Sequence, residues 1–135
     1  MAHWLVKSEP STYSWQRFVE EGSAVWDGVR NAQARLNLAA MKKGDEVLFY
    51  HSGEDRAVVG IAKVSGTARP DPTSEDPRWL AVDLVPVRPL PRPVTLADVK
   101  ATPSLKDIAL VRQSRLSVMP LGAAEFRAIV ALAKA

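Results

Sequence analysis

Four short segments hold most of the polar, aromatic and basic side chains that could do chemistry. They are residues 7–10, residues 26–31 together with Gln33 and Arg35, residues 50–52, and residues 111–117. Each adjoins the end of a predicted strand or helix, where loops of a small domain gather and carry its binding residues. These segments are the candidates for a functional site.

The positions of serine and histidine do not favour nucleophilic catalysis. Ser52 directly follows His51 at the end of a predicted strand, so their side chains diverge to opposite faces. Ser8 or Ser114 could meet His51 in the folded chain, but no nucleophile-elbow motif surrounds either serine. The isolated glycines form no phosphate-binding loop and no dinucleotide fingerprint. We expect no catalytic residues.

Metal chemistry and carboxylate chemistry are also poorly supported. The chain has no cysteine, which excludes thiol nucleophiles, disulfides and cysteine-based zinc sites. With two histidines, we expect neither a metal site nor a cofactor. Glu9 and Asp27 could form a carboxylate pair, but beside Pro10 and Gly28 they fit turn and capping roles equally well.

Trp26 lies in a loop-like stretch between two predicted helices and has no periodicity that explains it as core. A flat aromatic ring near Asn31 and Gln33 could stack on a nucleobase, with the amides contacting the base edge and Arg30 and Arg35 holding phosphates. Trp26 could equally plug the end of the domain, with Asn31 only capping a helix. Both interpretations stay open at this point.

The small net charge of +3 is unevenly distributed. Residues 26–43 and residues 100–117 each carry four basic side chains against one aspartate, so the rest of the chain is net acidic. Two separated basic segments are what a single phosphate-binding face would leave in a sequence. Two ordinary solvated surfaces would leave the same pattern.

The length of 135 residues predicts one domain, residues 1–135, with a substantial core. Apolar residues make up 47% of the chain and charged residues 24%, as in an ordinary globular protein. No apolar run approaches the roughly 20 residues that span a bilayer. We expect a soluble monomer in the cytoplasm, associated with a nucleoid, or in a nucleus, without a membrane partner.

Hydrophobic periodicity and turn residues divide the chain into alternating short elements. Strands are predicted at 3–7, 46–51, 57–64 and 79–87, with an extended segment at 116–119. Helices are predicted at 15–21, 31–41 and 123–133, and Ser14 and Asn31 are expected caps. Capping-box patterns at Thr95 and Ser104 each predict a short helix. Gly60 indicates a bulge or a close backbone approach.

Successive strands joined without regular helical crossovers favour an α+β fold with a mostly antiparallel sheet. At this length, a small β-barrel flanked by short helices and a C-terminal helix is the economical solution.

The chain also resembles the EVE domain family, which includes the thymocyte nuclear protein 1-like proteins. The resemblance runs in order from about residue 3 to residue 133. It is carried by residues 4–10, 13–15, 25–31, 33–35, 41–45, 47–52, 58–61, 70–73, 93–96 and 110–118. It implies a PUA-like fold, the superfamily of the YTH and ASCH domains, and a reader of modified bases, above all modified cytosine in DNA.

The resemblance implies a role for each candidate residue around a base flipped out of its stack. Trp26 would stack on the base with Tyr50 as a second wall, and Ser8 and Asn31 would read its edge. The 5-substituent would contact Ser114, Leu116 and Ser117. The phosphates would be held by Lys7, Arg30, Arg35, Arg112 and Arg115. Two alternatives stay open: an RNA-binding or RNA-processing module, and a small-ligand-binding protein or enzyme.

Overall fold

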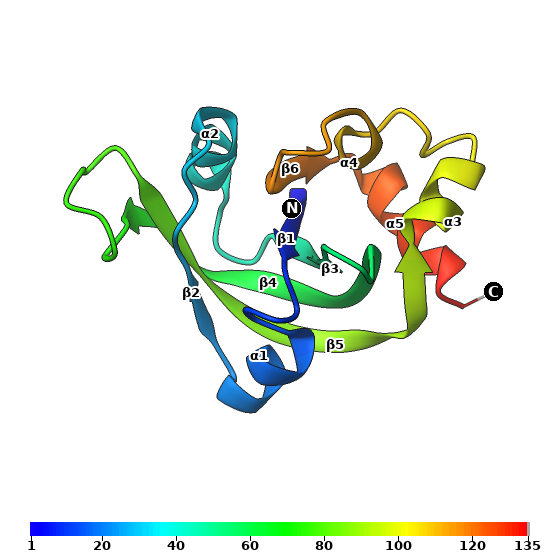
Figure 1. Cartoon of the computed structure of the whole chain (residues 1–135), viewed down its shortest axis with the longest axis horizontal. Helices are drawn as coiled ribbons and strands as arrows, with labels where there is room; N and C mark the ends of the chain where they lie inside the picture. Colours follow the sequence, from blue (N-terminus) through cyan, green and yellow to red (C-terminus); the bar gives the residue numbers. More distant parts are fainter. Residues whose placement is uncertain (135) are drawn as a thin grey trace.

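The computed structural model describes residues 1–134 and has an α+β architecture (Figure 1). Within these residues, six strands and five helices follow one another along the chain. Their bounds are β1 (His3–Ser8), α1 (Trp15–Glu21), β2 (Ala24–Trp26), α2 (Ala32–Ala40), β3 (Glu46–His51), β4 (Ala57–Pro70), β5 (Leu80–Thr95), α3 (Leu96–Ala101), α4 (Ala109–Arg112), β6 (Val118–Leu121) and α5 (Ala123–Leu132).

The strands form one sheet in the order β2-β5-β4-β3-β1-β6. Only the β1–β3 pair is parallel among the described strands, so the mostly antiparallel sheet that the sequence predicts is confirmed. The sheet is open, because the edge strands β2 and β6 do not pair with each other in residues 1–134. The predicted closed barrel is therefore wrong.

The physical reason for the open sheet lies at its two edges. Repeated register shifts in the β4–β5 pairing allow those strands to bend, but β2 has three residues and β6 only four, so little edge is left to pair. Helix α2 packs against β6, β5 and β4 instead, and the Asn37 amide donates to the carbonyl of Val118 at 2.7 Å. A helix thus takes the place that strand pairing would occupy in a barrel.

Strand β5 is longer than predicted and includes four prolines. β2 pairs with it only at residues 82–84, and Pro86, Pro89, Pro91 and Pro93 lie beyond this stretch, with no outer strand against them in the described chain. A proline cannot donate a backbone hydrogen bond, so it is tolerated on such an edge. The four prolines therefore extend this strand along an open edge of the sheet.

Local capping signals predict three of the four expected helix starts correctly. The side chains of Ser14, Asn31 and Thr95 accept hydrogen bonds from the first turns of α1, α2 and α3. The helix expected from Ser104 is absent, because residues 102–108 form successive turns that bury Leu105 and Ile108. Burial of these two side chains overrides the capping pattern, and α4 starts only after Ile108.

Gly60 is a close-approach position, as its place in the predicted strand indicated. The Trp15 ring lies against it so tightly that a Cβ atom would collide with the indole, and the β4–β5 register shifts beside it. Trp15 in turn packs edge-on against Phe49, with ring centroids 5.3 Å apart. Phe49 is fully buried and stacks on Phe18, which fixes α1 against the sheet.

Candidate functional site

A cleft of about 630 Å³ opens between the end of β1, the turn after it and the segment from β2 to the start of α2. Six of the twelve predicted site residues line it: Lys7, Ser8, Trp26, Arg30, Asn31 and Ser117. The other six do not line it: Tyr50, Ser114, Leu116, Arg35, Arg112 and Arg115. Segments far apart in the sequence therefore meet at one concave site.

Trp26 belongs both to the core and to the cleft wall. It is the last residue of β2, not part of a loop, and pairs with Val82 of β5. The residue is 8% exposed, and its ring makes edge contacts with Phe49 and Tyr13 at centroid distances of 5.5 and 6.2 Å. The two interpretations that the sequence left open are thus not exclusive in position, since the ring that plugs the core also faces the cleft.

Tyr13 is a cleft residue to which the sequence analysis assigned no role. The Ser8 hydroxyl donates to the Tyr13 carbonyl at 2.5 Å, which ties the end of β1 to the following turn. The Tyr13 hydroxyl donates to Glu21 at 2.7 Å. Burial and this bond to an anionic partner raise the pKa of Tyr13 to about 12. The available signal was its place in the family motif of residues 13–15.

Asn31 reaches the cleft from the N-cap position, directly before α2. Its side-chain oxygen accepts the Ala34 N–H at 2.9 Å, which is the N-cap interaction. Within residues 1–134, its amide NH₂ group makes no hydrogen bond. The cap therefore fixes the side chain while leaving two donor hydrogens for a ligand.

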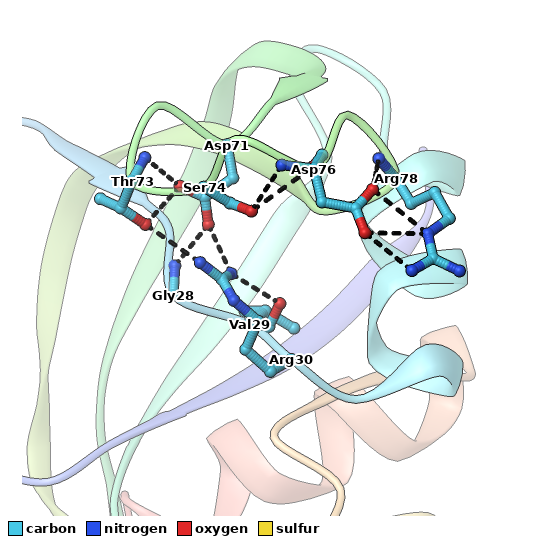
Figure 2. A network of polar contacts seen from close by, with 8 residues as sticks. All are labelled: Gly28, Val29, Arg30, Asp71, Thr73, Ser74, Asp76 and Arg78. Atoms are coloured by element: carbon cyan, nitrogen blue, oxygen red, sulfur yellow. Dashed lines mark hydrogen bonds and ion pairs between the residues drawn. The ribbon is translucent and has the colours of Figure 1, made fainter.

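Arg30 is held by a buried carboxylate that the sequence analysis missed (Figure 2). Asp71, with a fully buried side chain, accepts from Arg30 at 2.8 Å and from the Gly28 N–H at 2.8 Å. Thr73 donates to the same carboxylate through its N–H at 2.7 Å and its hydroxyl at 2.6 Å. The signal was the motif of residues 70–73, whose role only the folded chain reveals.

The ionisation of Asp71 follows from these contacts. Burial opposes the charged form, but the hydrogen bonds from Thr73, Arg30 and Gly28 outweigh it and hold the pKa of Asp71 well below its usual range. Asp71 is therefore an anion that anchors one cleft wall, residues 28–30, to the loop after β4.

Lys7 is less available to a phosphate than its sequence position suggested. Its ammonium donates to the Ser114 carbonyl at 2.9 Å, and burial lowers the pKa of Lys7. Its backbone N–H donates to the Ser117 carbonyl at 2.9 Å. These bonds bring residues 114–117 to the end of β1, where Ser117 lines the cleft. Leu116 is buried nearby.

Tyr50 lies beside Lys7 in the β1–β3 register and is 4% exposed. It belongs to the core and not to the lining of the cleft, so it does not form a second wall opposite Trp26 in this structure.

The remaining predicted phosphate residues occupy three different settings. Arg35 lies over the Trp79 ring at 5.6 Å, and Arg30 lies over the same ring at 5.7 Å. Arg112 is paired with Asp107 at 2.6 Å. Arg115 is exposed and has no hydrogen bond or ion pair within residues 1–134. The structure thus groups Arg30 with Arg35 beside the cleft.

Three carboxylates, Glu9, Glu21 and Asp27, line the cleft together with Lys7 and Arg30. Acidic groups outnumber basic ones there, which disfavours a phosphate in the cleft itself and leaves room for an uncharged ligand group. Residues 1–134 contain no group of three or more His, Asp or Glu side chains placed to hold a metal ion. No helix among them is long and apolar enough to cross a membrane.

Comparisons with known proteins extend the likeness over the whole chain. A model of the EVE domain family matches residues 2–132. Human thymocyte nuclear protein 1 is 33% identical over 170 aligned residues, which cover 97% of this chain and 73% of the human protein. The NMR structure of Rpa0253 from Rhodopseudomonas palustris has a TM-score of 0.94 at 46% identity, covering 99% of this chain and 94% of that one.

Two further structures bear on the site and on the fold. The crystal structure of human THYN1 protein in complex with 5-methylcytosine containing DNA has a TM-score of 0.93 at 32% identity, covering 100% of this chain and 99% of that one. The ASCH structure from Zymomonas mobilis has a TM-score of 0.60 at 12% identity, covering 96% of this chain and 94% of that one. The second likeness concerns the fold alone.

Proposed function

The chain belongs to the EVE domain family, and from this premise we propose that it binds DNA and holds one modified base, of the 5-methylcytosine class, in the cleft beside Trp26. The observation that carries the proposal is the cleft itself, walled by Trp26, in a chain 32% identical to a human protein solved in complex with 5-methylcytosine containing DNA. We propose binding without catalysis, in a compartment that holds DNA.

The size and the lining of the cleft suit a base better than a backbone. A volume of about 630 Å³ falls within the range of small-molecule sites. The base must leave its stack to enter, because a base edge cannot be enclosed inside a duplex. Stacking on an aromatic ring contributes about 1–3 kcal/mol per base, so Trp26 would supply a large part of the affinity.

Basic side chains outside the cleft would hold the DNA backbone. Arg30 and Arg35 stand together on Trp79 beside the opening, and Arg115 is free of any ion pair in the described residues. Contacts of this kind position the nucleic acid, whereas groups that touch the base edge specify it. Asn31 is the strongest candidate for an edge contact, because its NH₂ group is oriented by the cap and unused.

A binding panel with one variant tests the proposal. Labelled DNA and RNA oligonucleotides carrying cytosine, 5-methylcytosine, 5-hydroxymethylcytosine, adenine or N6-methyladenine are titrated at two salt concentrations. We expect the modified-cytosine DNA to bind most tightly. Replacing Asn31→Ser should lower that preference several-fold while keeping the helix cap and the melting temperature, because serine caps as well as asparagine does.

The control is Gln33→Ser, which removes an exposed amide of the same helix that does not line the cleft. Equal affinity for all bases would contradict the proposal and leave only electrostatic binding. Tighter binding of every RNA than of its DNA counterpart would replace it with the RNA-binding alternative.

A further inference from the structure

The cleft lining includes several hydrogen-bond acceptors that remain free for a ligand. The Ser8 hydroxyl donates its single hydrogen to the Tyr13 carbonyl, so it can only accept a hydrogen bond from a ligand. The carboxylates in the lining are acceptors by nature. The Asn31 amide adds an oriented donor to this lining, because its oxygen is occupied by the cap and its NH₂ group is free. The cleft lining therefore offers a ligand free carboxylate acceptors together with the oriented amide donor of Asn31.

Of the three carboxylates, only Asp27 both lacks a partner within residues 1–134 and directly follows the proposed stacking residue. Glu21 is occupied by the Tyr13 hydroxyl at 2.7 Å and by Arg17 at 3.2 Å. The carboxylate of Glu9 lies against the hairpin turn at Gly53. A Cβ atom added at Gly53 would be 3.6 Å from the Glu9 Oε1 atom. Asp27 directly follows Trp26, lines the cleft, and its carboxylate has no hydrogen bond or ion pair within residues 1–134.

The chemistry of the pyrimidines makes this arrangement selective. Cytosine presents an exocyclic amine donor where thymine presents a carbonyl acceptor, and 5-methylcytosine and thymine carry the same methyl group at C5. A carboxylate facing that position would accept from the amine and repel the carbonyl, leaving the thymine oxygen desolvated without a partner. A pocket that sensed the methyl group alone could not tell these two bases apart.

Resting on the proposed function, we infer that Asp27 is the acceptor that reads the exocyclic amine of the bound base. The cleft thereby accepts 5-methylcytosine and rejects thymine despite their identical methyl groups. Asn31 would donate to the ring nitrogen or carbonyl of the same edge, so the two residues together match the donor and acceptor order of cytosine.

The test compares 5-methylcytosine with thymine at one position of a labelled DNA duplex, opposite an abasic nucleotide. Neither base is then paired, so the cost of flipping is nearly equal for the two. We expect the wild-type protein to bind the 5-methylcytosine duplex about tenfold more tightly than the thymine duplex, the ratio that one good edge contact supplies. Asp27→Ala should reduce this ratio to below about threefold, mainly by losing affinity for 5-methylcytosine.

Glu9→Ala is the matched control, because it removes the same charge from the same cleft. It should leave the ratio near its wild-type value. An Asp27→Ala protein that keeps the wild-type ratio, or a Glu9→Ala protein that loses it equally, would overturn the inference. Both exposed sites lack partners whose loss would unfold the domain, and melting temperatures verify that each variant is folded.

Failure of the proposed function itself has a different signature. A duplex with abasic nucleotides on both strands would then bind the wild-type protein as tightly as the 5-methylcytosine duplex does. A third outcome is that the 5-methylcytosine and thymine duplexes bind equally well, and both bind more tightly than the doubly abasic one. The protein would then hold the base and sense only its methyl group, and Asp27 would not discriminate between the two bases.

Discussion

The buried carboxylate of Asp71 connects two loops that are distant in sequence by accepting hydrogen bonds from both. It accepts four hydrogen bonds, from Gly28, from Arg30 and twice from Thr73. A buried anion is tolerated only when its partners compensate for lost hydration, and here each lone-pair direction has a donor. The same contacts orient the Arg30 guanidinium beside the cleft, so Asp71 links the stability of the two loops with the geometry of the proposed binding site.

The Asp71→Ala substitution should therefore lower the free energy of unfolding by about 1–3 kcal/mol, because it leaves several hydrogen-bond donors without an acceptor. The loss should depend on pH. Because the pKa of Asp71 is depressed in the folded protein, its contribution is fully present above the unfolded value of about 4 and is lost as the pH falls below it. Urea unfolding of both proteins at pH 7, 5 and 3 should show a constant difference at the first two values and a smaller one at pH 3.

The Asp76→Ala variant is the control for this measurement, because Asp76 is in the same loop but pairs with the exposed Arg78 (Figure 2). Its unfolding midpoint should stay near that of the wild-type protein. An Asp71→Ala deficit that persists undiminished at pH 3 would show that lost packing, and not the anion, is responsible.

Among the elements, β4 and α1 meet at a contact with no spare room in the core. The Trp15 ring occupies the space where any residue other than glycine at position 60 would place its Cβ. Trp15 also donates its backbone N–H to the His51 ring at 3.0 Å. This hydrogen bond fixes the start of α1, so the Trp15 ring cannot easily move away from Gly60. Such a site responds to added volume with strain.

Gly60→Ala is expected to destabilise the protein by about 1–3 kcal/mol through this overpacking. The near-ultraviolet circular dichroism of the tryptophans should change with it. Thr67→Ala, on the exposed part of the same strand, serves as the comparison and should leave both the unfolding midpoint and the spectrum nearly unchanged. A Gly60→Ala protein as stable as the wild type would mean that the ring shifts without cost.

The elements also mark what sequence patterns could and could not predict. Caps at Ser14, Asn31 and Thr95 were predictable because a cap depends on neighbours three residues away. Ser104 has the same local pattern, but burial of the residues after it decides its structure. Closure of the sheet depends on the pairing of β2 with β6, which are about ninety residues apart, and no local pattern reports on it.

The candidate site divides in the same way. Trp26, Ser8 and Asn31 could be chosen from residue type and motif, and they do line one cleft. The roles of Asp71 and Tyr13 could not, because each depends on partners brought together by the fold: Asp71 binds a segment forty residues earlier, and the Tyr13 carbonyl accepts from the end of β1. The motifs predicted residues that line the cleft, whereas the contacts that support them depend on the tertiary fold.

At the scale of the whole molecule, the two basic segments do not contribute equally to a phosphate-binding surface. In the first, Arg30 and Arg35 share the Trp79 ring beside the cleft. In the second, Arg112 is neutralised by Asp107, whereas Arg115 is exposed and unpaired within residues 1–134. An arginine already paired with a carboxylate gains less from a phosphate, because it must first give up its partner.

Two arginines three residues apart therefore make a matched test of backbone binding. For modified-cytosine DNA, Arg115→Ala should flatten the slope of log affinity against log salt by about 0.9, the share of one phosphate on duplex DNA. Arg112→Ala should change the slope by much less. Fluorescence anisotropy titrations at four salt concentrations measure both, and an unchanged slope for Arg115→Ala would exclude a phosphate contact by that residue.

Trp26 closes the hydrophobic core and walls the cleft with one side chain, and this sharing constrains how the family could diverge. A substitution that reshaped that wall to suit another ligand would at once weaken the contact with Phe49 on which folding depends. Substitution costs less stability at the exposed lining residues Glu9, Asp27 and Asn31, whose side chains are not part of the core. A change of base specificity that preserves the fold is therefore expected from substitutions at those exposed positions, with Trp26 left in place.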